Sequence, residues 1–164
     1  MADEEKRKME DIVQTLMQVK HFLFSMGHFL SEVGRIFQPH LKKMLLVMGG
    51  GGLGAASRYG VSLLTAKLWG PHFPWGTLVV NLVGCFLIGL IFALADRVRF
   101  LTPDVRLLLI TGYLGALTTF SSFSLETVNA GRAGMALLPL ANILINNVGG
   151  LALTFFGIWL GGLK

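Results

Sequence analysis

The chain has 164 residues, of which 53% are hydrophobic and only 14% are charged. Soluble domains carry about a quarter charged residues, so this composition excludes an ordinary soluble domain and favours a membrane protein. The net charge of +5 does not indicate nucleic-acid binding, because the basic residues form no stripe with interleaved aromatic side chains. Cations that flank apolar segments anchor and orient membrane proteins.

Residues 1–43 differ from the rest and hold more than half of the charged residues. Apolar residues recur there at alternating steps of four and three: Ile12, Leu16, Val19, Leu23, Met26, Leu30, Val33 and Phe37. This spacing predicts one amphipathic helix, which Pro39 closes. Three interpretations stay open: the helix lies in the membrane interface, it pairs with another helix, or the segment is a fusion.

Residues 44–164 form the predicted membrane domain. Four apolar segments are each long enough to cross about 30 Å of hydrocarbon: 44–68, 75–95, 105–129 and 134–161. Short polar or proline-containing links join them, so consecutive helices are antiparallel neighbours. The fold class expected is therefore an all-α membrane protein with four transmembrane helices and an extra N-terminal helix.

The first two segments each place polar residues among apolar ones. Arg58 lies well inside the first segment, where an arginine must reach the interface or a partner. Thr77 and Asn81 share one helical face of the second segment with Gly84. An asparagine in lipid needs a partner, so Asn81 either bonds to another helix or contacts an ion. The glycines of the first segment indicate close helix packing.

The third segment concentrates hydroxyl groups around two phenylalanines, Phe120 and Phe123. Five of seven consecutive residues carry a hydroxyl: Thr118, Thr119, Ser121, Ser122 and Ser124. Hydrocarbon tolerates such a cluster only where protein, water or a bound ion satisfies the polar groups. The sequence therefore predicts a broken membrane helix that lines an ion path. Glu126, the acidic residue of this segment, faces water or bonds to hydroxyls.

The fourth segment carries a polar track at intervals of four residues. Asn142, Asn146, Gly150 and Thr154 share one helical face, which is typical of the wall of a narrow polar path. The histidines and the single cysteine, Cys85, lack metal-ligand spacing. No combination of a nucleophile with a base indicates an enzyme.

Four motifs together resemble the small fluoride channels of the CrcB or Fluc family over residues 44–164. They are Gly51-Gly52 with Gly54-Ala55 and Arg58-Tyr59, GTLVVNLVG from Gly76, GYLGALTTFSSFSLE from Gly112, and the asparagine track that closes in Trp159-Leu160-Gly161. The resemblance implies passive fluoride efflux that protects the cell, in the bacterial inner membrane. It implies an antiparallel dual-topology dimer with two pores.

The resemblance also assigns roles to residues of this chain. Phe120 and Phe123 line the pore, Asn81 contributes an amide, and Thr119 and Ser122 contribute hydroxyls. Asn142, Asn146 and Thr154 continue the anion path. The backbone carbonyls of Gly115 and Thr118 hold a structural sodium ion at the dimer interface. Arg58, Thr77 and Glu126 are structural.

The sequence also allows alternatives to this interpretation. One predicted membrane side holds most flanking cations (Lys42, Lys43, Arg97, Arg99, Arg106 and Lys164), against Lys67 and Arg132 on the other. This bias allows a heterodimer with an oppositely oriented homologue instead of the antiparallel homodimer. A small multidrug-type proton-coupled exporter wants a carboxylate in the first segment, which has none. A non-transporting membrane scaffold is the third possibility.

Overall fold

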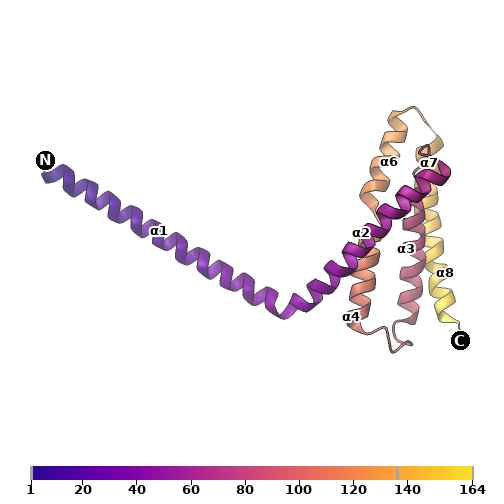
Figure 1. Cartoon of the computed structure of the whole chain (residues 1–164), viewed down its shortest axis with the longest axis horizontal. Helices are drawn as coiled ribbons and strands as arrows, with labels where there is room; N and C mark the ends of the chain where they lie inside the picture. The colour runs from indigo at the N-terminus through magenta and orange to yellow at the C-terminus, as the bar shows by residue number, and fades with distance from the viewer. Residues whose placement is uncertain (1, 136, 164) are drawn as a thin grey trace. The chain divides into compact units, whose positions relative to one another are not determined.

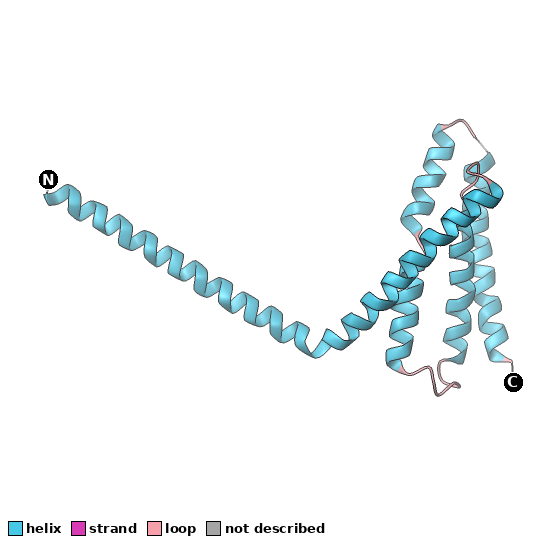
Figure 2. Ribbon diagram, viewed as in Figure 1, coloured by secondary structure: helices cyan, strands magenta, loops and turns pink. Residues whose placement is uncertain are grey.

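The computed structural model of the chain describes residues 2–135 and 137–163, and it gives only the backbone of residues 2–8 and 10–12. The side chain of Ile12 and the charge of Lys164 lie outside the described residues. Over the described ranges the secondary structure is helical, without strands (Figure 2). The chain divides into two compact units, Met1–Lys42 and Lys43–Lys164.

The first unit is built on one long helix, α1 (Ala2–Phe37). A short 3-10 turn, η1 (Gln38–His40), follows it and has Pro39 in its first turn. Proline lacks the backbone N–H that would continue the α-helical bonding, so α1 ends where the sequence predicts. On its surface, Arg35 forms an ion pair with Glu32 at 3.0 Å.

Two long helices open the second unit (Figure 1). Helix α2 (Leu41–Trp69) ends at Gly70, whose φ of +78° is a left-handed conformation that glycine adopts without a Cβ clash. The Gly70 N–H donates to the Ala66 carbonyl at 3.1 Å. Helix α3 (Trp75–Leu94) follows after a link that contains Pro71 and Pro74.

The third apolar segment is a series of helical pieces. They are α4 (Pro103–Arg106), the π-helix η2 (Leu107–Leu114), α5 (Gly115–Leu117) and α6 (Phe120–Arg132). Thr102 caps the start of α4, where its hydroxyl accepts a hydrogen bond from the Val105 N–H. A turn through Gly134, with φ of +77°, closes α6.

The fourth apolar segment is also divided. It consists of α7 (Leu137–Leu144), the π-helix η3 (Ile145–Gly149) and α8 (Gly150–Gly162). The guanidinium of Arg97 donates to the carbonyls of Gly161 and Gly162 at 3.2 and 3.0 Å. A cation at this place satisfies carbonyls that the end of α8 leaves without helical partners.

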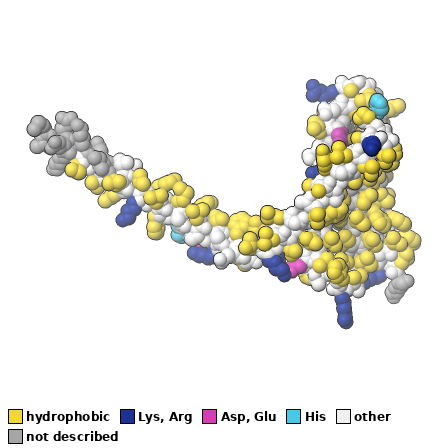
Figure 3. All heavy atoms as spheres, in the orientation of Figure 1, with side chains coloured by type: hydrophobic (Ala, Val, Ile, Leu, Met, Phe, Trp, Pro, Cys, Tyr) yellow, Lys and Arg dark blue, Asp and Glu magenta, His cyan; other side chains and the backbone are white. Residues whose placement is uncertain are grey.

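Three described helical stretches are long and apolar enough to cross a membrane: Trp75–Leu94, Pro103–Arg132 and Leu137–Gly162. Helix α2 is long enough, but its glycines and Arg58 lower its hydropathy. Large apolar side chains cover much of the surface of the second unit (Figure 3). Such a surface is typical of a protein that faces lipid or partner subunits.

Glycines set the closest helix contacts in the second unit. Helices α3 and α8 lie side by side (Figure 1). A Cβ on Gly89 of α3 would collide with the Thr154 carbonyl, and one on Gly157 of α8 would collide with the Phe86 carbonyl. Likewise, a Cβ on Gly54 of α2 would collide with the Tyr113 carbonyl. Small residues let helix backbones approach, as the composition indicates.

Candidate functional site

The third apolar segment is interrupted between α5 and α6. Thr118 has φ −80° and ψ 152°, and Thr119 has φ −151° and ψ 116°, so both residues are extended. Thr119 then caps the restarted helix, because its hydroxyl oxygen accepts a hydrogen bond from the Ser122 N–H at 3.2 Å. The hydroxyls of Ser121 and Ser122 lie 3.2 Å from the same oxygen.

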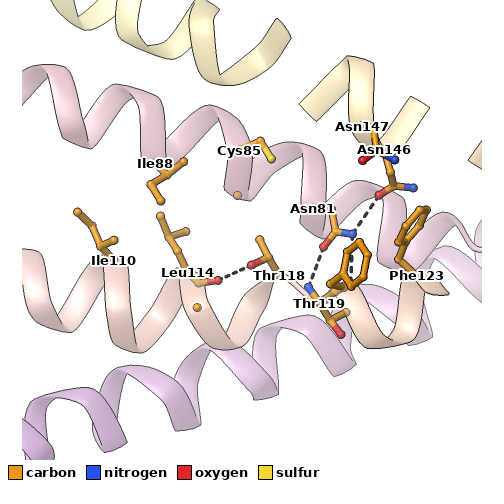
Figure 4. Close-up of a pocket in the computed structure, with 13 residues that line it drawn as sticks. Asn81, Cys85, Ile88, Ile110, Leu114, Thr118, Thr119, Phe123, Asn146 and Asn147 are labelled. Atoms are coloured by element: carbon orange, nitrogen blue, oxygen red, sulfur yellow. Dashed lines mark hydrogen bonds between the residues drawn. The ribbon is translucent and has the colours of Figure 1, made fainter. Parts of the chain in front are cut away.

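The side chain of Asn81 pairs with the backbone of the interruption (Figure 4). Its Oδ1 accepts from the Thr119 N–H at 2.8 Å, and its Nδ2 donates to the Thr119 carbonyl at 3.4 Å. The same Nδ2 donates to Oδ1 of Asn146 at 3.0 Å. An amide from α3 therefore satisfies the Thr119 N–H, which the extended conformation removes from the helix.

This pairing releases two backbone carbonyls, those of Gly115 and Thr118. In a continuous α-helix the carbonyl of residue 115 accepts from the N–H of residue 119, but that N–H is bonded to Asn81. The Ser122 N–H, which would serve the Thr118 carbonyl, is bonded to the Thr119 hydroxyl. Both carbonyls are therefore available to a ligand. Neutral carbonyl oxygens suit a hard cation, so these residues fit a sodium ion.

A chain of amides connects the interruption to the fourth apolar segment. From Asn146, Nδ2 donates to Oδ1 of Asn142 at 2.8 Å, and from Asn142, Nδ2 donates to the Thr127 hydroxyl at 2.8 Å. Asn142 is completely buried. Each of these polar side chains is bonded to the next, which is how buried polar groups persist in an apolar interior.

A cavity of about 320 Å³ opens beside the interruption (Figure 4). Its lining combines the amides of Asn81, Asn146 and Asn147 with apolar side chains, and none of the described residues that line it is charged. The predicted site residues that line it are Asn81, Gly115, Thr118, Thr119, Phe120, Phe123 and Asn146.

The two phenylalanines occupy different environments. Their ring centroids lie 5.5 Å apart with the planes tilted by 51°. Phe123 is buried, 7% exposed, whereas Phe120 is 76% exposed in the single chain. We expect a phenylalanine side chain that is exposed to this extent, next to polar groups, to be buried by lipid or by another subunit.

Three predicted path residues lie outside the lining of the cavity. Ser122 bonds to Thr119 at the start of α6, and Asn142 is buried behind Asn146. The Thr154 hydroxyl lies within 3.1 Å of the Cys85 carbonyl and 3.0 Å of the Gly150 carbonyl. A hydroxyl has one hydrogen, so in this arrangement Thr154 serves the contact between α3 and α8.

The residues predicted to be structural are also separate from the cavity. Thr77 donates to Oε1 of Glu126 at 2.7 Å. The other carboxylate oxygen of Glu126, Oε2, is buried and has no hydrogen-bond partner within the described residues. Arg58 is half-buried in α2 and forms no hydrogen bond or ion pair in the part of the chain that the structure describes.

Sequence reasoning did not single out several residues that belong to this site. Asn147 and Cys85 line the cavity, and Thr127 ends the amide chain. The sequence contained a signal for Thr127, because this residue adds one more hydroxyl to the third apolar segment. Among the described residues, no cluster of three or more His, Cys, Asp or Glu side chains could hold a metal ion.

A protein family and several known proteins match the part of the chain that contains this site. The family model described as "CrcB-like protein, Camphor Resistance (CrcB)" matches residues 45–158. A fluoride-specific ion channel FluC from Dehalococcoides mccartyi is 44% identical over 121 residues, which are 74% of this chain and 93% of that protein. A FluC from Salinibacter ruber is 48% identical over 117 residues, 70% of this chain and 86% of that protein. A third, from Aeromonas salmonicida, is 44% identical over 120 residues, with shares of 73% and 96%.

Proposed function

Because this chain belongs to the CrcB-like protein family, we propose that it is a fluoride-specific ion channel. It is a multi-pass protein of the bacterial inner membrane and lets fluoride leave the cytoplasm passively. The observation that carries the proposal is the uncharged cavity beside the interruption, where amides and two phenylalanines lie together.

These groups suit a small, strongly hydrated anion. Fluoride must exchange its water for good hydrogen-bond donors, and amide N–H and hydroxyl groups are donors. The edge of a phenylalanine ring carries partial positive charge, whereas its face repels an anion. Conduction requires binding that is strong enough to admit the ion and weak enough to release it. A lining without a fixed cation meets the second requirement.

The donors of the path are occupied before an ion arrives. The Asn81 amide hydrogens are bonded to Thr119 and Asn146, and those of Asn146 are bonded to Asn142. Fluoride therefore enters by exchanging with these acceptors, one amide at a time. Further donors to fluoride are the Thr119 and Ser122 hydroxyls and the Asn142 side chain. Thr154 extends the path when its hydroxyl no longer donates to the Cys85 carbonyl.

We further propose that two chains form an antiparallel homodimer with two pores, in which α2 is the fourth membrane crossing. The 76% exposure of Phe120 supports this arrangement, because a second chain would cover the ring and complete the wall of the cavity. The released carbonyls of Gly115 and Thr118 support a sodium ion at the interface. Two such pairs around a two-fold axis supply four oxygens.

Fluoride efflux from vesicles that contain the purified chain tests the function. We expect Phe123→Ile to abolish or greatly reduce efflux, because isoleucine has no positively polarised ring edge. Phe92→Ile is the matched control, since Phe92 is 70% exposed on α3 outside the cavity, and it should conduct like the parent chain.

The same vesicles discriminate the competing functions. Passive leak of fluoride but not of chloride, independent of a proton gradient, supports the channel. Proton-coupled exchange of organic cations would instead identify an exporter, and absence of any flux in the parent chain would identify a scaffold. Normal efflux in Phe123→Ile would remove this ring from the pore.

A further inference from the structure

Helix α1 contains a sequence repeat that the channel function does not use. Three consecutive heptads, 16–22, 23–29 and 30–36, each begin with leucine and have Val or Met at the fourth position, His or Arg at the sixth and Phe or Ile at the seventh. The apolar members, with Phe37 opening the next heptad, are Leu16, Val19, Phe22, Leu23, Met26, Phe29, Leu30, Val33, Ile36 and Phe37. We call this set the α1 seam.

The α1 seam has no cover within its own unit. Hydrophobic side chains lie along the described part of α1 (Figure 3), and the members of the seam, apart from the half-buried Val33, are between 41% and 64% exposed. Three of them are phenylalanines, each able to bury roughly 150–250 Å². With the seven aliphatic side chains added, the area that the seam can bury reaches the range of roughly 800 Å² per partner that stable interfaces bury.

The period of the seam indicates what kind of partner covers it. A strict seven-residue repeat drifts by about 20° per heptad around a straight α-helix, and helices that supercoil around each other remove this drift. A flat lipid surface does not. The repeat over three heptads therefore favours another helix as the partner.

Two glycines support close approach of that helix. Gly27 and Gly34 occupy the fifth position of the second and third heptads, on one edge of the α1 seam. Glycine is a poor helix former, and a Cβ at either position would meet nothing within 4 Å of its own chain. Their own unit therefore gives no packing reason for glycine, whereas a neighbouring backbone at this edge would.

The charges of this stretch are compatible with self-pairing and fit a lipid surface less well. Interfacial helices are rich in Lys and Arg on the polar face, but the three heptads contain only Lys20 and Arg35, and Arg35 is paired with Glu32. At the fifth and seventh positions, which lie on either side of the first and fourth positions of each heptad, Lys20 is the only charged residue of the three heptads. No ladder of like charges opposes a second copy.

We propose that α1 self-associates, with the α1 seam packed against the same seam in other copies of this chain. The proposal does not depend on fluoride conduction. In an antiparallel dimer the two N-termini lie on opposite sides of the membrane, so α1 joins chains of different channel dimers. The helix thereby gathers channels into larger assemblies.

Cysteine cross-linking of the full chain in bacterial-lipid vesicles tests this arrangement. We expect Leu23→Cys, within the seam, to give covalent dimers on oxidation at several times the yield of His28→Cys, which lies at the sixth position on the opposite face. The parent chain, which keeps Cys85, sets the background. Equal yields at the two positions would mean random collision and would overturn the proposal.

Two further measurements separate association from folding and from lipid binding. Gly27→Leu improves helix propensity but obstructs close approach, so it should lower the mass of the detergent-solubilised assembly while helix content is kept. An unchanged mass would contradict the inference. If lipid-attached quenchers reached a fluorophore coupled to the new thiol of the Leu23→Cys variant, the seam would face the bilayer, and this result would also contradict it. Fluoride efflux from the same Gly27→Leu vesicles should equal that of the parent.

Discussion

Asn81 holds the backbone of the interruption in its extended form. Its Oδ1 accepts from the Thr119 N–H and so replaces the bond that this N–H would make in a continuous helix, and its Nδ2 also donates to the Thr119 carbonyl. Both backbone groups are part of a residue that is 7% exposed. A buried polar group without a partner destabilises a fold, and the interruption therefore depends on Asn81 as well as on the Thr119 hydroxyl that caps α6.

We expect Asn81→Leu to destabilise the protein by about 1–3 kcal/mol, because it leaves the buried Thr119 N–H without a partner. Thermal unfolding in detergent measures the change. Asn147→Leu is the control, since the Asn147 amide donates only to the Ile143 carbonyl of its own helix and the residue is exposed. Equal melting temperatures for the two variants would show that Asn81 does not support the interruption.

At the scale of elements, the contact between α3 and α8 determines how close the polar groups of the two segments come. Gly89 and Gly157 bring backbone against backbone, and the same approach places Asn81 within 3.0 Å of Asn146. The π-helix η3 carries Asn146 in this region. Such π segments occur frequently at functional sites.

Gly157→Ala should separate α3 from α8, because its Cβ would collide with the Phe86 carbonyl. Overpacking of this kind costs about 1–3 kcal/mol, and fluoride efflux should fall with the loss of stability. Gly162→Ala, in the same helix, meets nothing within 4 Å and should behave like the parent chain. Unfolding and efflux assays on both variants provide the comparison, and a fully stable Gly157→Ala would contradict the packing.

At the scale of the whole molecule, the single chain leaves residues of the candidate site exposed. Phe120 and Gly115, which both line the cavity, are exposed. The proposed antiparallel dimer would account for these features, because a second copy would complete the wall of the cavity. In the proposed dimer, the released carbonyls of Gly115 and Thr118 would hold the sodium ion between the two copies.

Removal of sodium should therefore weaken the proposed dimer. When N-methylglucamine, which is too large for a carbonyl site, replaces sodium in detergent solution, we expect the channel to shift from dimer to monomer in size-exclusion chromatography. Restoring sodium should reverse the shift. A dimer of equal stability in sodium-free solution would show that these carbonyls have another role.

The sequence by itself determined the local features of this protein. Apolar runs and their links indicated the helices, Pro39 marked the end of α1, and the hydroxyl cluster drew attention to residues 118–124. The motifs identified the family, which the comparisons confirm. These features follow from near neighbours in the chain, because helical hydrogen bonds and amphipathic spacing join residues within one or two turns.

The tertiary structure alone decided which polar groups meet. The Asn81–Thr119 bonds span 38 residues and the Asn81–Asn146 bond spans 65, so no local pattern specifies them. Only this packing showed that Asn146 lines the cavity while Asn142 is buried behind it, and that Thr154 bonds to α3. The reason is physical. The sequence allows an amide to bond to an ion, to another helix or to a freed backbone group, and its partner is fixed only when two helices approach closely enough to exclude water.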